Sequence, residues 1–88
     1  MPSEIVLVNV SGDDQPGLMS MLTSSLTQFQ VRILDVGQAV IHDQLNVGML
    51  VQIMDSTQVS AVLQKLDDCA RDAGISARFS PISESDYA

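Results

Sequence analysis

The sequence predicts an α+β domain in which a four-stranded antiparallel sheet carries two helices on one face. Segment 45–54 alternates apolar and polar residues, which is the period of a strand with one buried face. Segments 16–28 and 59–73 repeat apolar residues at spacings of three and four, the period of an amphipathic helix. Strand-like segments lie before, between and after these two, so the elements follow the order βαββαβ.

Residues 4–11 form the first predicted strand. It is apolar on both faces, as expected at the centre of a sheet, and its apolar residues are Ile5, Val6, Leu7, Val8 and Val10. The first helix follows over residues 16–28. Its predicted buried stripe consists of Leu18, Met21, Leu22, Leu26 and Phe29.

The second strand, residues 31–41, carries an acid at its middle. Asp35 lies on the same face as Gly37, and an acid is disfavoured inside a strand. Two interpretations stay open at this point: an exposed edge strand, or a strand that faces a ligand or partner across an interface. A hairpin turn over residues 42–44 follows, in which we expect His42 to be solvated.

The last three elements complete the sheet and the helical layer. Gly48 in the third strand leaves room for a close approach of backbone or ligand. Asp55 or Ser56 is expected to cap the second helix, and Gly74 to end it. The fourth strand covers 75–82. This order of elements is the ferredoxin-like arrangement, and its helix-free face includes Ile5, Leu7, Leu50 and Met54, which indicates a partner.

Length and composition indicate one small domain. The chain has 88 residues, of which 45% are apolar, and a domain of this size has modest stability unless it dimerises. We expect residues 1–82 to form the domain, and the polar segment 83–88 to be a frayed end or the start of a linker. The chain has a single cysteine, Cys69, and we find no secretory signal and no apolar run long enough to span a membrane. These observations together predict a cytoplasmic protein.

The charge of the chain disfavours nucleic acids and membranes as partners. A net charge of −7 repels a phosphate backbone and an anionic bilayer. RNA-recognition domains share the βαββαβ order, but they stack bases on aromatic side chains and carry basic residues. This chain has two phenylalanines, one tyrosine and four lysines or arginines in total. We therefore expect neither nucleic acid nor membrane as a partner.

The stretch from Val8 to Met19 is the candidate site. Pro16 suits the first turn of a helix, because its φ is fixed near the helical value and it lacks an N–H donor. Asp14 is placed to cap the helix, and Gly12 and Gly17 allow the backbone to bend. The expected corner offers backbone N–H donors beside a carboxylate, which suits a small zwitterion.

Residues 10–18 resemble the Gly-x-Asp-x-Pro-Gly signature of the ACT domain family of amino-acid-sensing modules. Segments 34–41 and 45–51 are similar to the second and third strands of the ACT segment that precedes the catalytic domain in many bacterial phosphoserine phosphatases. The resemblance covers residues 4–81. It implies a regulatory domain without a cofactor, which binds L-serine or a similar small amino acid. The partner is a second ACT domain, either in a homodimer or in the same parent chain.

The resemblance and the residues together predict a ligand site at this corner and on the second strand. Asp14 would accept hydrogen bonds from the ligand's ammonium group, and N–H groups near Gly17 and Leu18 would bind its carboxylate. Asp13 departs from the family pattern, since it is a second acid beside Asp14. This acid would repel a ligand carboxylate. The predicted ligand-binding residues are Gly12, Asp13, Asp14, Gln15, Pro16, Gly17, Leu18, Asp35 and Val36.

Other functions predict different residues. Phosphoserine phosphatases of this type use an aspartate nucleophile in an Asp-x-Asp-x-Thr motif, which this sequence lacks, as it lacks metal-ligand spacing. We therefore expect no catalysis and no metal site in this chain itself. The resemblance implies a phosphoserine phosphatase of serine biosynthesis as its parent protein. Two alternatives stay open: a free-standing or tandem ACT regulator of amino-acid metabolism, of the glycine-cleavage type, and a dimerisation module without a ligand.

Overall fold

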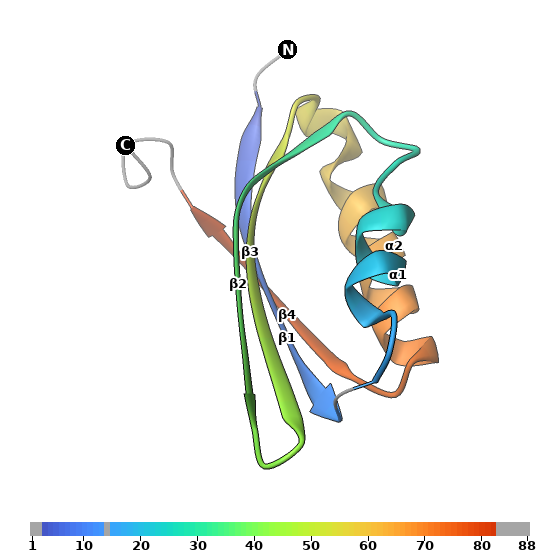
Figure 1. Cartoon of the computed structure of the whole chain (residues 1–88). Helices are drawn as coiled ribbons and strands as arrows, with labels where there is room; N and C mark the ends of the chain where they lie inside the picture. The colour runs from blue at the N-terminus through green and yellow to red at the C-terminus, as the bar shows by residue number, and fades with distance from the viewer. Residues whose placement is uncertain (1–2, 14, 83–88) are drawn as a thin grey trace.

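The computed structural model describes residues 3–13 and 15–82. The elements follow in the predicted order, as Figure 1 shows. They are β1 (Glu4–Asp13), α1 (Leu18–Ser25), β2 (Val31–Ile41), β3 (Gln44–Ile53), a single 3-10 turn η1 (Ser56–Gln58), α2 (Val59–Asp72) and β4 (Ser76–Ile82). The predicted tail, 83–88, lies outside the described residues. No helix within those residues is long and apolar enough to span a bilayer.

The four strands form one antiparallel sheet in the order β2-β3-β1-β4. Both helices lie against the same face of this sheet, and the other face is open (Figure 1). The ferredoxin-like fold is therefore confirmed, with β1 at the centre and β2 and β4 at the edges. Pro81 lies in β4, in agreement with the edge position that its missing N–H indicates.

The hydrophobic core lies between the sheet and the two helices. Strand β3 confirms the predicted alternation most clearly, because every second residue is at most 3% exposed. Those residues are Leu45, Val47, Met49, Val51 and Ile53. The helices contribute Leu18 and Leu22 from α1, and Val62, Leu66 and Ala70 from α2. Burial of each valine, leucine, isoleucine or methionine side chain in this core contributes roughly 1.5–3 kcal/mol.

Helix α1 starts two residues later than predicted. The backbone N–H of Leu18 donates to the carbonyl of Gln15 at 3.4 Å, which closes a turn with Pro16 second and Gly17 third. Gly17 has φ +78°, and a proline followed by a left-handed glycine is the chemistry of a type II turn. The prediction that Pro16 occupies the first helical turn is therefore wrong, because the glycine after it reverses the chain first.

The C-terminal end of α1 also falls short of the prediction. After Ser25 the backbone continues with bonds to the third residue back, from Leu26 to Thr23 at 3.1 Å and from Thr27 to Ser24 at 3.2 Å. These bonds tighten the chain into turns. The regular helix thus has eight residues rather than the predicted thirteen positions from 16 to 28.

The predicted capping residue Asp55 lies one turn before α2, whose own N-cap is Gln58 without a side-chain hydrogen bond. The Asp55 carboxylate accepts hydrogen bonds from the Thr57 N–H at 2.9 Å and its hydroxyl at 2.7 Å. The bond from the Thr57 side chain, more than that from its backbone, lowers the pKa of Asp55. Asp55 caps η1, and α2 follows from Val59.

At the other end of α2, Gly74 adopts φ +73°. Its N–H donates to the carbonyl of Arg71 at 3.1 Å, while the Ile75 N–H donates to the carbonyl of Ala70 at 2.9 Å. This pair of bonds is the Schellman motif, which accounts for the glycine. The predicted end of the helix is confirmed, and Ile75 enters the core as the next residue.

A hairpin turn connects β2 to β3 at the predicted place, but it has two residues rather than the predicted three, because Gln44 already pairs with Ile41 as the first residue of β3. His42 and Asp43 have positive φ values of 51° and 64°, the backbone of a type I′ hairpin turn. Both side chains are exposed, which confirms the solvated position expected for His42. Neither residue is glycine, so each holds a conformation that L-residues adopt at a cost.

Candidate functional site

The candidate corner runs from the end of β1, through the turn, to the start of α1. Strand β1 is two residues longer than predicted, because Gly12 and Asp13 still pair with Leu45 and Gln44 of β3. Asp14 lies outside the described residues. The first turn of a helix leaves N–H groups without intrahelical acceptors, and in α1 these belong to the residues that follow Gly17.

Gly12 has a packing role at this corner. A Cβ atom on Gly12 would lie 2.5 Å from Cγ2 of Ile75, which is closer than real Cβ atoms approach, and 3.2 Å from the Ile75 Cα. Ile75 is the buried residue that follows the Gly74 cap of α2. The missing side chain therefore lets the end of β1 lie directly against the link between α2 and β4.

Gln15 connects the turn to the same α2–β4 link by a hydrogen bond. Its side-chain Nε2 donates a hydrogen bond to the carbonyl of Ala73 at 3.1 Å, and this bond is partly buried. Ala73 is the C-cap residue of α2, whose carbonyl lacks an intrahelical donor. Gln15 thus stabilises the end of α2 and holds the corner against it at the same time.

Asp13 is engaged with the neighbouring strand. Its Oδ1 accepts a hydrogen bond from Nε2 of Gln44 at 2.6 Å, across the pair that these residues form between β1 and β3. Both residues are exposed. Asp13, the acid that departs from the family pattern, is therefore oriented toward β3 by the Gln44 amide of the same chain.

Asp35 and Val36 lie far from the corner within one chain. Asp35 pairs with Leu50, which pairs with Leu7, whereas the corner begins at Asp13, six residues further along β1. At about 3.3 Å per residue this offset is roughly 20 Å along the strands. Within one chain the predicted strand residues therefore lie apart from the corner, whose described members are Gly12, Asp13 and residues 15–18.

Strand β2 is an edge strand, as one of the two interpretations of Asp35 required. A bulge lies between Ile33 and Asp35, and the Asp35 carboxylate accepts from the N–H of the next residue, Val36, at 2.9 Å. Asp35 and Gly37 pair with Leu50 and Gly48, so they share the open face as predicted.

The helix-side face of β2 is largely uncovered and mostly apolar, with Gln38 as its polar member opposite buried Val47. Ile33, Val36 and Val40 pair with buried residues of β3, so they point toward the helical layer. They are nevertheless 41%, 41% and 54% exposed. The short helix α1 leaves them open, and the outer backbone edge of β2 has no neighbouring strand among the described residues.

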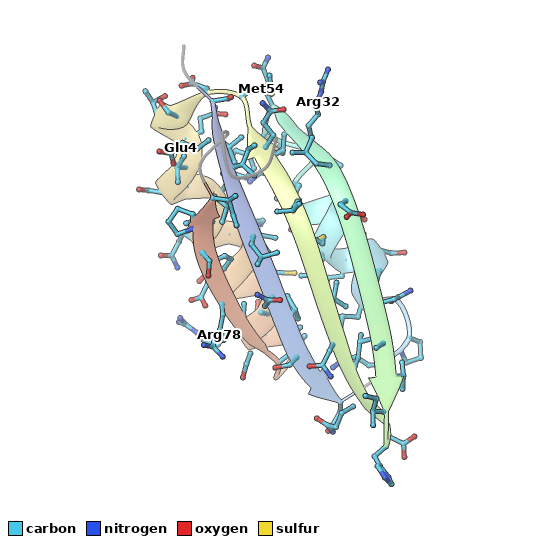
Figure 2. The ribbon with its side chains drawn as sticks, turned by 90° about the vertical axis from the view of Figure 1, so that its left-hand side faces the viewer. Glu4, Arg32, Met54 and Arg78 are labelled. Carbon is cyan, nitrogen blue, oxygen red and sulfur yellow. The ribbon has the colours of Figure 1, made fainter. Side chains whose placement is uncertain are left out.

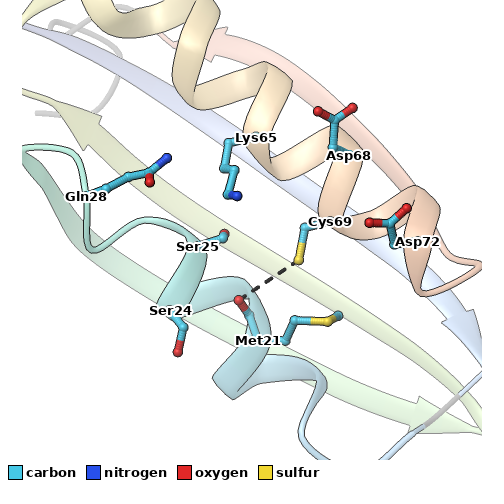
Figure 3. A pocket seen from close by; sticks show the side chains of 8 residues that line it. All are labelled: Met21, Ser24, Ser25, Gln28, Lys65, Asp68, Cys69 and Asp72. Atoms are coloured by element: carbon cyan, nitrogen blue, oxygen red, sulfur yellow. Dashed lines mark hydrogen bonds between the residues drawn. The ribbon is translucent and has the colours of Figure 1, made fainter.

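A cavity of about 400 Å³ lies between α1 and α2, away from the predicted site (Figure 3). Its lining includes Lys65, Asp68 and Asp72 of α2 and Ser24 of α1. The half-buried Cys69 points into it, with Sγ 4.0 Å from the carbonyl of Met21. The Cys69 thiol thus faces the neighbouring helix α1.

The sequence missed the residues that hold the corner in place. Gln44, Ala73 and Ile75 contact Asp13, Gln15 and Gly12 from distant parts of the chain, Ala73 being 58 residues from Gln15. The Gly74 stop signal marks the nearby end of α2. No pattern within the sequence indicates that this helix end meets the corner.

Comparison with known proteins identifies the family. The ACT domain family model matches residues 4–80. "Phosphoserine phosphatase SerB2" of Mycobacterium tuberculosis is 46% identical over 52 residues, which cover 58% of this chain and 13% of that protein. "UPF0237 protein MMP0657" of Methanococcus maripaludis is 33% identical over 67 residues, 72% of this chain and 74% of that protein.

The solved structures agree in fold. A structure described as a putative glycine cleavage system transcriptional repressor superposes with a TM-score of 0.86 at 17% identity, over 94% of this chain and 48% of that one. This chain thus spans about half of the repressor and about an eighth of the mycobacterial phosphatase. Since the family model covers nearly every described residue, the chain belongs to the ACT domain family.

Proposed function

We propose that this regulatory domain senses a small amino acid, with L-serine favoured, at an interface between two ACT domains. The ligand would lie between the corner of one domain and the middle of β2 of a second. We further propose that the parent protein is a phosphoserine phosphatase of serine biosynthesis. The 46% identity to the mycobacterial phosphatase over 52 residues supports this parent.

The open edge of β2 is the observation that carries the proposal. One chain holds the two halves of the predicted site about 20 Å apart along the strands, so a second copy has to supply the other half. Antiparallel pairing of two β2 strands about Gln38 would place Val36 opposite Val40 of the partner subunit. Both valines are exposed on the helix side, and together they would form an apolar cross-strand pair.

The same register moves Asp35 toward the corner. It would place Asp35 of the partner subunit opposite Ile41, which pairs with Gln44, which pairs with Asp13. The strand acid of one copy and the corner of the other would then share one transverse row of the combined sheet. A ligand that binds this paired state better than the separate domains shifts the population toward pairing.

The corner has the groups that such a ligand requires. Backbone N–H groups at the start of α1 would bind the ligand carboxylate. Asp14 would accept hydrogen bonds from the ammonium group. The amide of Gln44 turns Asp13 toward β3, which reduces the repulsion that the sequence alone indicates for a ligand carboxylate.

Calorimetric titration of the 88-residue chain with serine, glycine and other small amino acids tests the ligand. We expect saturable binding, strongest for serine. Asp14→Asn keeps a side chain that caps helices and removes the charge, so it should raise the dissociation constant at least about tenfold. Asp43→Asn, on the exposed hairpin turn, is the matched control and should bind as the parent chain does. Absence of saturable binding to every amino acid would contradict the sensing proposal.

Sedimentation of the same chain tests the interface. We expect serine to shift the population toward dimer. Val40→Lys should prevent this shift, because it places an ammonium group against Val36 of the partner subunit. Ala39→Lys, one residue earlier on the opposite face of the strand, should weaken pairing less. A serine complex that stays monomeric would contradict the shared site.

A dimerisation module without ligand is the second candidate, and one observation favours it. Several of the predicted ligand residues already have partners within the chain. Gly12 packs against Ile75, Asp13 accepts a hydrogen bond from Gln44, Gln15 donates one to Ala73, and the Leu18 N–H donates to the Gln15 carbonyl. A dimer that forms equally with and without amino acids would support this candidate. Tighter binding of glycine than serine would instead support a regulator of the glycine-cleavage type.

A further inference from the structure

The open face of the sheet contains a depression that neither helix reaches. Directly paired residues of neighbouring strands share a face, so the register groups the side chains into transverse rows. One such row consists of Gly37, Gly48, Asn9 and Arg78, from β2, β3, β1 and β4 in turn. Its two glycines leave half of the row without side chains. Figure 2 shows this face, with Arg78 at the β4 edge.

A cavity of about 290 Å³ lies over the β4 half of this row. The amides of Asn9 and Asn46, the hydroxyl of Ser11 and the guanidinium of Arg78 line it beside Gly48. These groups are exposed and offer several hydrogen-bond donors with a single positive charge. Within the described residues, 3–13 and 15–82, the one ion pair at 4 Å or less is Arg71–Asp67. Arg78 therefore has no acidic partner among them.

The neighbouring row on the same face is apolar at its centre. It consists of Asp35, Leu50, Leu7 and Ser80, in the same strand order. Leu7 and Leu50 are half-buried, and they lie about 7 Å from Asn9 and Gly48, two residues along each strand. A ligand held by Arg78 would therefore extend its body over two leucines, with Asp35 at the far end of that row.

We propose that this depression binds a small monocarboxylate with a short aliphatic body. The guanidinium fork of Arg78 matches a carboxylate in two parallel hydrogen bonds, and the asparagine amides add neutral donors. The two leucines suit the aliphatic part. A second carboxylate would lie over the leucines without a positive partner, so a dicarboxylate binds more weakly than a monocarboxylate of equal length.

This site is separate from the corner and does not depend on the proposed amino-acid sensing. It uses the open face, whereas the corner is held against the α2–β4 link by Gly12 and Gln15. Resonances of Gly48 and Asn9 report on the depression, and those of Gly17 and Leu18 report on the corner. Failure of one proposal is therefore distinguishable from failure of the other.

Titration of the ¹⁵N-labelled chain with sodium butyrate, at an ionic strength held constant with sodium chloride, tests the proposal. We expect saturable shifts of the Gly48 and Asn9 amides and of the Asn9 and Asn46 side-chain NH₂ groups. Their dissociation constant should be on the order of millimolar, as befits a shallow site. Arg78→Gln should raise it at least about tenfold. Arg32→Gln, an exposed arginine elsewhere on the same face, should leave it unchanged.

A second pair of variants tests the depression itself. Gly48→Val fills it, and the new Cβ would lie 3.5 Å from Oδ1 of Asn9, an ordinary contact that the fold accommodates. This variant should abolish the butyrate shifts. Gly37→Val adds the same side chain one strand away, with no other atom within 4 Å of its Cβ, and should retain binding.

Succinate and inorganic phosphate complete the test as competing anions. We expect both to bind more weakly than butyrate. The second carboxylate of succinate would lie over the leucines without a positive partner, and phosphate has no apolar part to contact them. The proposal is overturned if the butyrate shifts do not saturate, if Arg78→Gln and Arg32→Gln behave alike, or if phosphate binds more tightly than butyrate.

Discussion

Strands β3 and β2 are neighbours joined by a two-residue turn, and their side chains have opposite environments. The helix-side residues of β3 are at most 3% exposed, whereas Ile33, Val36 and Val40 on the same side of β2 are 41–54% exposed. Sequence composition does not explain the contrast, since both strands are rich in aliphatic residues. Strand β3 has a neighbour on each side, while β2 has one among the described strands. An aliphatic edge strand that its own chain leaves uncovered is a surface suited to a partner.

The sharpest test of this comparison uses a directly paired couple, Met49 of β3 and Val36 of β2. Met49 is fully buried, so Met49→Ala should lower the free energy of unfolding by about 2–5 kcal/mol. Val36→Ala at 41% exposure should cost less than about 1 kcal/mol in dilute monomer. Urea unfolding measures both. Equal losses in the two variants at low protein concentration would contradict the difference in environment.

The second prediction compares two glycines, one at the corner and one on β2. Gly12→Ala brings a methyl group to 2.5 Å from Ile75 Cγ2, so it should cost about 1–3 kcal/mol through overpacking. Gly37→Ala meets no atom within 4 Å and should be neutral or stabilise by up to about 1 kcal/mol, because alanine loses less chain entropy. Thermal unfolding of the two variants gives the contrast. A harmless Gly12→Ala would mean that the corner is not fixed against Ile75.

The third prediction concerns the turn that joins the two strands. Asp43 has φ +64°, which glycine adopts without steric cost. Asp43→Gly should therefore stabilise the domain by about 0.5–1 kcal/mol, after the entropy cost of glycine in the unfolded chain is subtracted. Chemical denaturation would show this as a higher midpoint at an unchanged slope. A lower midpoint would indicate that the Asp43 carboxylate itself contributes to the hairpin.

The smallest expected effect lies just beyond the end of β3, at Asp55. Hydrogen bonds from Thr57 lower the pKa of Asp55 below its usual value of 3.8. The stabilisation from its ionised form is therefore present above that usual value and is lost as the pH falls through the lowered pKa. Asp55→Asn keeps the cap without the titration, so its melting temperature should fall less than that of the parent chain between about pH 5 and about pH 2. Identical pH profiles would show that the Thr57 bonds do not favour the ionised carboxylate.

Much of the fold could be predicted from short-range patterns. The alternation along β3, the helical stripe of α2 and the stop signal at Gly74 depend on neighbours within one or two turns, so the sequence displays them directly. The start of α1 could not be placed correctly from Pro16, because two features compete there. Proline suits a first helical turn, but Pro16 followed by Gly17 closes a type II turn before the helix begins.

Local patterns were enough to predict the order of elements, the buried faces of the strands and helices, and the residues available at the corner, because periodicity and turn chemistry depend on near neighbours in the chain. Which distant residues contact that corner depends on the tertiary structure: Ile75 packs against Gly12, and the Ala73 carbonyl accepts a hydrogen bond from Gln15. The tertiary structure also decided that Asp35 lies on an edge strand far from the corner, and that two glycines and Arg78 meet in one row of the open face. These relations follow from strand order and register, which arise only when the whole sheet pairs.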